Sequence, residues 1–227
     1  MVSPNLPFTA VLFDLDGTIV DSASGITESL AYTYERMGLP VPSPAKMLAW
    51  VGPPIMDSFR DLAGLDQQES LRALDIYREH YLGSGNAFAP AYPGIVDVLR
   101  AIADNGIPLS LATSKPEGTA RAMLESLGIV GLFSEITGSS DDETRSSKAD
   151  VVAEALRRLA ADGADISHPV MVGDRRHDIE GAAEHHVPTI FVTWGYGAPE
   201  ETAGAIAVVD TPAELLAALG LAEHAAA

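Results

Sequence analysis

One short stretch near the start of the chain constrains the fold more than any other. Residues 10–13 form an apolar run that ends abruptly in Asp14 and Asp16, followed by Gly17 and Thr18. Two unpaired carboxylates would lose their hydration inside a strand, whereas the carboxyl ends of parallel strands are where open sheets bind ligands. The run therefore predicts a buried parallel strand with a polar ligand site at its end. The plainer interpretation is a strand followed by an ordinary Asp-Gly turn.

The residue types at this strand end favour a site for magnesium and phosphate. The oxygens of Asp14 and Asp16 are hard ligands of the kind that Mg²⁺ prefers. Gly17 lets the backbone come close to an anion, so its amide and that of Thr18 can donate hydrogen bonds to phosphate oxygens.

Hydrophobic periodicity predicts only helices between this strand and residue 82, and alternating helices and strands from residue 93 onward. The helices expected in the first block are 22–37, 45–51, 55–63 and 67–82, with a linker at 83–90. In the second block we expect strands at 107–113, 132–138, 169–173, 188–193 and 207–209, and helices at 94–105, 116–127, 147–161, 177–186 and 212–219.

Apolar strands that alternate with helices are typical of a doubly wound parallel sheet with right-handed crossovers. We therefore expect an α/β, Rossmann-like core domain made of residues 1–21 and 89–227. The all-helical block, residues 22–88, is expected to be a cap domain inserted after the first strand.

Composition narrows the partners. The formal net charge is −18, and such a surface repels nucleic-acid polymers. No window approaches the roughly 18 apolar residues of a membrane span, so we expect no membrane partner. Cysteine is absent, which fits a cytoplasmic location. Any phosphate site needs local cations, and lysine occurs only at Lys46, Lys115 and Lys148, so these positions are informative.

The predicted strand at 107–113 also ends in polar residues. The hydroxyl of Thr113 can hydrogen-bond a phosphoryl oxygen. Ser114, with Glu117 three residues later, matches the capping box of a following helix. We expect Thr113 to face the site and Ser114 to cap the helix, and we keep Ser114 and Lys115 as candidate phosphate contacts.

Lys148 begins the predicted helix 147–161, where a positive charge opposes the helix dipole. This local misfit indicates a role outside the helix, although a solvated surface lysine is the commoner fate of this residue type.

A second apolar strand, residues 169–173, ends in Gly173-Asp174, and Asp178 follows four residues later. If Asp178 lies in the first helical turn, both carboxylates can face one metal ion. Because aspartate is also favourable at a helix N-terminus, one of the two could serve only as a cap.

Together these pieces resemble the haloacid dehalogenase-like hydrolases, in the phosphatase branch with two aspartates and in the phosphoglycolate phosphatase and 5′-nucleotidase-like subgroup with a helical cap. The resemblance rests on residues 13–22, on Thr113-Ser114-Lys115-Pro116, on Lys148, and on Gly173-Asp174 with Asp178. Many members have proline after the lysine of the third motif, whereas Ala149 follows here, so Lys115 is the runner-up for that role.

The resemblance implies a Mg²⁺-dependent phosphatase that hydrolyses small phosphomonoesters through an aspartyl-phosphate. Asp14 would be the nucleophile, and Asp16 would act first as the general acid and then as the general base. Lys148 would offset negative charge at the phosphoryl group, whose oxygens Thr113, Gly17 and Thr18 would hold. The implied metal ligands are Asp14, the carbonyl of Asp16, Asp174 and Asp178.

In the cap, the turn at Gly52 resembles a loop that reaches towards substrate, and Arg60 is a candidate contact for an anionic group of the substrate. Phosphoglycolate and nucleoside 5′-monophosphates are the leading substrates. A phosphosugar mutase of the same family is the alternative chemistry, and a non-catalytic binding or regulatory protein is the alternative class. We expect a monomer or a homodimer.

Overall fold

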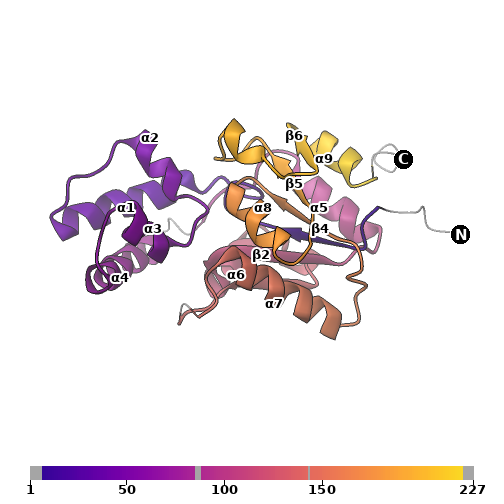
Figure 1. Cartoon of the computed structure of the whole chain (residues 1–227), viewed down its shortest axis with the longest axis horizontal. Helices are drawn as coiled ribbons and strands as arrows, with labels where there is room; N and C mark the ends of the chain where they lie inside the picture. The colour runs from indigo at the N-terminus through magenta and orange to yellow at the C-terminus, as the bar shows by residue number, and fades with distance from the viewer. Residues whose placement is uncertain (1–6, 85–87, 143, 222–227) are drawn as a thin grey trace, which may run out of the picture.

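The computed structural model describes residues 7–84, 88–142 and 144–221. Its centre is a six-stranded parallel sheet in the order β3-β2-β1-β4-β5-β6 (Figure 1). The strands are β1 Ala10–Phe13, β2 Leu109–Pro116, β3 Glu135–Ser139, β4 Pro169–Gly173, β5 Thr189–Val192 and β6 Ala207–Val209. The predicted doubly wound, Rossmann-like α/β fold is confirmed.

Strand β1 lies at the point where the strand order reverses. Val11 is in register with Leu109 of β2 on one side and with Val170 of β4 on the other. The carboxyl ends of these three strands therefore meet at one edge of the sheet, which is where doubly wound sheets bind ligands.

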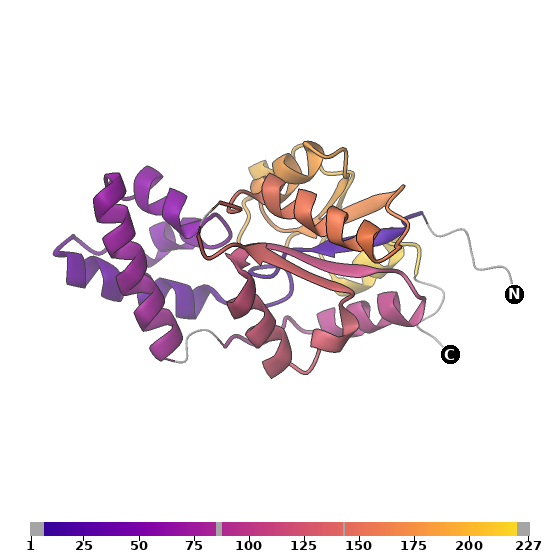
Figure 2. The same ribbon diagram turned by 90° about the horizontal axis from the view of Figure 1, so that it is seen from below.

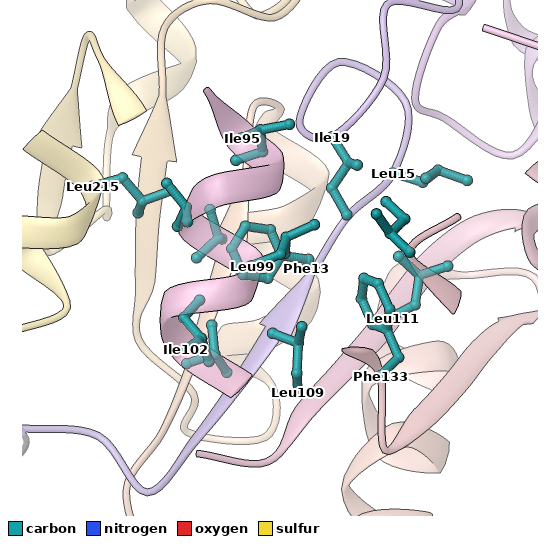
Figure 3. Packing of buried hydrophobic residues seen from close by; sticks show 14 of the residues in the cluster. Phe13, Leu15, Ile19, Ile95, Leu99, Ile102, Leu109, Leu111, Phe133 and Leu215 are labelled. Atoms are coloured by element: carbon teal, nitrogen blue, oxygen red, sulfur yellow. The ribbon is translucent and has the colours of Figure 1, made fainter. Parts of the chain in front are cut away.

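Successive side chains of a strand point to opposite faces of the sheet. Both faces of β1 are buried, because each packs in a hydrophobic cluster of its own. Val11 and Phe13 belong to a cluster with Leu99, around helices α5, α6 and α9 (Figure 3). Leu12 belongs to a second cluster with Val151, under α7 and α8. The helices are α5 Ile95–Asp104, α6 Glu117–Ser126, α7 Lys148–Ala161, α8 Arg176–Ala183 and α9 Pro212–Ala218.

The helical block after β1 has its own hydrophobic cluster and stands beyond one end of the sheet (Figures 1 and 2). We call helices α1–α4 and the segments that connect them the cap. Trp50 contacts both Tyr34 and Phe59 edge to face, and Tyr77 stacks on Tyr81. The cap elements are α1 Ala23–Met37, α2 Pro44–Met47, a 3₁₀ turn Leu48–Trp50, α3 Ile55–Asp61 and α4 Gln67–Gly83.

Local signals explain where the cap helices begin and end. Asp66 and Glu69 form a reciprocal capping box at the start of α4. The predicted helix 45–51 is instead α2 followed by the 3₁₀ turn, because Val51 donates to Leu48 three residues back just before Gly52. Residues 85–87 lie outside the described part of the chain. The predicted domain boundary at residue 88, which adjoins them, therefore stays a prediction. The same holds for the part of the predicted linker 83–90 that falls on residues 85–87.

Among the described residues, no helix combines the length and the apolar character that crossing a membrane requires.

Candidate active site

Three buried carboxylates gather at the carboxyl edge of the sheet. Asp14 follows β1, Asp174 follows β4, and Asp178 lies in the first turn of α8. One oxygen from each lies within 4.8 Å of the others. In the described part of the chain these side chains therefore form a group that can hold a metal ion, and their hard oxygens fit a divalent cation of the Mg²⁺ type.

Lys148 is the cation of this cluster. Its Nζ donates to Asp14 Oδ1 at 2.7 Å and to the carbonyl of Ala112 at 2.9 Å, and it lies 2.7 Å from Asp178 Oδ1. The residue begins α7, so its position against the helix dipole is offset by two carboxylates. Burial alone would lower the pKa of Lys148, but Asp14 and Asp178 together raise it above its ordinary value. The ammonium thus stays charged inside the site.

The carboxylates remain undercompensated without a metal. Burial raises the pKa of Asp14 to about 6, against the lowering effect of Lys148, and Asp178 adds to the rise. Burial also raises the pKa of Asp174 well above its usual range, with further contributions from Asp178 and Asp14. Lys148 contacts two of the three carboxylates, so a divalent cation would balance the remaining charge.

Asp174 is enclosed by backbone from two loops. Tyr196 donates its amide to Asp174 Oδ2 at 2.7 Å, and the Thr18 hydroxyl donates to Oδ1 at 3.2 Å. A Cβ on Gly17 would lie 2.3 Å from Oδ2, and one on Gly195 would lie equally close. Gly17 also has a φ of +89°, a conformation that favours glycine. Only residues without side chains fit here.

The amides of Gly17 and Thr18 serve the turn in this structure. The Gly17 amide donates to the carbonyl of Val20 at 2.9 Å, and the Thr18 amide donates to that of Leu15 at 3.3 Å. The geometry therefore does not support the prediction that these amides hold phosphate oxygens. Close packing against Asp174 accounts for Gly17 instead.

Asp16 faces a different lysine. Lys115 Nζ donates to both Asp16 carboxylate oxygens, at 3.0 and 2.9 Å, and the pair is almost entirely buried. Nζ also lies 4.9 Å from the centre of the Tyr81 ring, which belongs to the cap. Although burial opposes the charge, Asp16 raises the pKa of Lys115 above its ordinary value. The expected contribution of the Asp16 carbonyl to a metal stays a prediction.

The end of β2 differs from the expectation. The strand continues to Pro116, and α6 begins at Glu117 without a side-chain cap, so Ser114 does not cap it. The Ser114 hydroxyl is buried and has no hydrogen-bond partner among the described residues. Thr113 is buried beside the site, and its hydroxyl oxygen accepts from the Lys115 amide at 3.2 Å, which leaves its proton available.

The cap contributes through its loop at Gly52 rather than through Arg60. A Cβ on Gly52 would lie 3.0 Å from the Arg175 side chain, so the loop packs directly on the core. Arg60 pairs with Asp57 on the exposed surface of α3 and does not line the cavity beside Asp16. Its role as a contact for an anionic group of the substrate stays a prediction, which the exposed position of Arg60 on α3 does not favour.

Two core residues that the motifs did not single out join the core to the cap. Arg175 donates to the carbonyl of Val51 in the cap and lies 3.1 Å from Glu201. The Tyr196 hydroxyl donates to Asp21 and accepts from the amide of Ala23, where α1 begins. In the sequence, only the position of Arg175 next to Asp174 could have indicated its role. Its contacts with Val51 and Glu201 join segments far apart in sequence, which no local pattern predicts.

A cavity of about 220 Å³ opens between the cap and the core beside Asp16 and Lys115. A second groove is lined by residues of both the cap and the core, among them Lys148 and Arg175.

A parallel α/β core with carboxylates and a lysine at its switch point, covered by a helical cap, defines a class of phosphoryl-handling hydrolases. The family model described as haloacid dehalogenase-like hydrolase matches residues 11–192, and the chain belongs to this family.

Relatives within the family carry different names. The chain is 41% identical over 195 residues to a protein of Mycobacterium tuberculosis named tyrosine-protein kinase PtkA, which covers 86% of this chain and 65% of that protein. It is 34% identical to a 5′-nucleotidase of Pseudomonas aeruginosa, over 86% of this chain and 87% of that protein. The chain thus spans just under two thirds of the mycobacterial relative.

Solved structures agree with the fold. A predicted phosphatase from Clostridium acetobutylicum superposes with a TM-score of 0.85 at 36% identity, covering 92% of this chain and 96% of the other.

Proposed function

We propose that this protein is a Mg²⁺-dependent phosphatase that hydrolyses small phosphomonoesters through an aspartyl-phosphate on Asp14. The observation that carries the proposal is the cluster of Asp14, Asp174 and Asp178 at the switch point of the sheet, in which Lys148 contacts Asp14 and Asp178. A site this rich in buried carboxylates needs a cation, and its oxygens are those that Mg²⁺ prefers.

Asp14, Asp174 and Asp178 would hold the ion, with the Asp16 carbonyl as the further predicted ligand. Bound there, Mg²⁺ offsets the negative charge that otherwise keeps an anionic nucleophile from an anionic phosphate. The remaining work falls to side chains of this chain.

Asp14 would be the nucleophile of this reaction. A carboxylate oxygen of Asp14 forms a bond to phosphorus while the bond from phosphorus to the ester oxygen breaks. Lys148, 2.7 Å from Asp14 Oδ1, keeps the carboxylate oriented and stabilises charge on the phosphoryl oxygens. The Thr113 hydroxyl would donate a hydrogen bond to one of those oxygens. Water then attacks phosphorus and releases inorganic phosphate and free Asp14.

Asp16 is the proton carrier of this scheme. It would give a proton to the leaving oxygen and later take one from the attacking water. Because Lys115 donates to both Asp16 oxygens here, Asp16 must exchange this contact for a proton before it acts as an acid. Substrate entry beside the pair is the event that would drive the exchange.

The cap would enclose the reacting groups and exclude bulk water, and it contacts the core at Arg175 and Tyr196. We infer that the cap domain comprises residues 22–88. An enclosed site favours small phosphomonoesters, with phosphoglycolate and nucleoside 5′-monophosphates as the first candidates.

The test is phosphate release from a panel of phosphomonoesters, with and without Mg²⁺, for the wild type and Asp14→Asn. Metal-dependent release that the variant loses supports the proposal. Full turnover by Asp14→Asn would refute the scheme. Interconversion of sugar phosphates would indicate a mutase, and transfer to a protein tyrosine would indicate the activity named for the mycobacterial relative. Binding without any of these reactions would favour a regulatory protein.

A further inference from the structure

The cavity beside Asp16 lies on the side of the site where the leaving group must be. Asp16 lines this cavity, whereas Asp14, Thr113 and Lys148 do not. If Asp16 protonates the leaving oxygen, the rest of the leaving group has to occupy space next to Asp16. The walls of the cavity therefore describe the leaving group.

Those walls are mainly apolar and aromatic. The cap supplies Ile26, Trp50, Ile55, Tyr77, Tyr81 and Leu82. Tyr77 and Tyr81 stack on each other with ring centres 5.5 Å apart and planes 12° apart, and Lys115 Nζ lies 4.9 Å from the centre of the Tyr81 ring. A planar ring packs well beside such aromatic side chains, and aromatic pairs gain energy beyond the area they bury.

The charges that line the cavity offer little to a second anionic group. The charged lining residues are Asp16, Lys115, Arg78 and Asp141, whose formal charges cancel. Lys115 is engaged by both oxygens of Asp16. A leaving group that carries a carboxylate would meet no net positive charge in this space, in a protein whose net charge is −18.

Two polar atoms in the wall lack a partner. The buried hydroxyls of Ser114 and Tyr81 have no hydrogen bond in the described structure, and both residues line the cavity. Buried hydroxyls are normally hydrogen-bonded. A ligand with one polar group on its edge would satisfy Ser114.

We propose that this cavity is a leaving-group subsite for a planar aromatic ring, with Tyr81 as its specificity-determining residue; the assignment rests on the proposed phosphatase function. An apolar cavity of about 150 Å³ accommodates benzene in another protein, so the volume here of about 220 Å³ takes a ring with a short polar substituent. Phenolic esters and nucleotides share this chemistry. Phosphoglycolate does not.

The first test measures binding without turnover. Phenylphosphonate and phosphonoacetate carry the same non-hydrolysable head, so their difference reports the subsite. With saturating Mg²⁺, calorimetry on the full chain should give about tenfold tighter binding of phenylphosphonate. Equal affinities, or tighter binding of phosphonoacetate, would overturn the inference. Selective binding without phosphate release from any ester would instead refute only the proposed function.

Variants of Tyr81 locate the effect. Tyr81→Leu should lose most of the preference for phenylphosphonate while phosphonoacetate binding stays within about twofold. Tyr81→Phe keeps the ring and should keep the preference. Tyr32→Leu is the matched control, since Tyr32 is a partly exposed cap tyrosine that does not line the cavity. If Tyr81→Leu bound neither ligand, the substitution would have damaged the site as a whole. The ligand preference of Tyr81→Phe and of the wild type then decides whether the subsite exists.

Turnover separates the two sources of the ring. Phenyl phosphate, adenosine 5′-monophosphate and phosphoglycolate are compared by kcat/KM. A preference for either aromatic ester supports the subsite and names its source. Preference for phosphoglycolate overturns it.

Discussion

Lys148 Nζ donates to Asp14 Oδ1 at 2.7 Å across 134 positions of the sequence. Both side chains are about 4% exposed, so this is a buried ion pair with Asp178 as a third member. Removing the lysine of such a group leaves its carboxylates uncompensated, which is far more costly than losing a surface pair.

We expect Lys148→Met to lower kcat on the order of 10³-fold and to destabilise the metal-free protein by about 3 kcal/mol. Added Mg²⁺ should restore much of the stability, because it replaces the missing positive charge, but not the activity. Chemical denaturation with and without Mg²⁺ measures this. Lys46→Met, at an exposed lysine of α2, is the control and should change neither quantity.

Asp14→Asn should abolish turnover and stabilise the metal-free protein at pH 8. Because the pKa of Asp14 is about 6 in the folded protein against an ordinary value of 3.8, the folded state binds more protons than the unfolded state at pH values between the two. Stability therefore falls as pH rises through this window, and the full penalty, up to about 3 kcal/mol, is present above pH 6. Removing the charge removes the penalty. A metal-free variant less stable than the wild type at pH 8 would contradict this account.

Mg²⁺ affinity should fall as pH drops below about 6. Metal binding requires ionised carboxylates, and Asp14, with its pKa raised to about 6, must release its proton first. Calorimetric titrations in buffers of different ionisation enthalpy should show proton release at pH 6 and little at pH 8. Affinity independent of pH between 5 and 8 would mean that Asp14 is not a ligand.

Gly195→Ala should disrupt the metal site. The new Cβ would lie 2.3 Å from Asp174 Oδ2 and 2.4 Å from the carbonyl of Gly17. We expect a stability loss of about 2–4 kcal/mol and a large drop in Mg²⁺ affinity. Gly118→Ala is the matched control, since a Cβ there meets nothing within 4 Å and alanine favours helix α6. Thermal unfolding at several Mg²⁺ concentrations compares the two.

Arg175→Met should raise KM by about tenfold with a smaller effect on kcat, because the guanidinium joins the core to the cap loop at Val51. The neighbouring Arg176 is exposed, and its side chain pairs with Glu180. Arg176→Met should therefore behave like the wild type in steady-state kinetics. Equal effects of the two substitutions would mean that loss of positive charge, not the cap contact, is responsible.

Much of the fold was predictable because it depends on local patterns. The apolar run before Asp14 indicated a buried parallel strand, and the alternation of elements after residue 93 indicated a doubly wound sheet. The helix at 45–51 and the cap at Ser114 were predicted wrongly. In both places the backbone conformation depends on tertiary contacts or local steric constraints, and the periodicity of the sequence carries no information about either.

The sequence by itself determined the strand ends that carry Asp14 and Asp174, because parallel strands bring their carboxyl ends to one edge. It also marked Lys148, through its misfit with the helix dipole. Only the tertiary structure decided that Lys115 engages Asp16, that Arg175 reaches the cap, and that Gly195 packs against Asp174. These contacts join segments whose separation in space depends on how the cap docks and the loops close, and no local propensity encodes that distance.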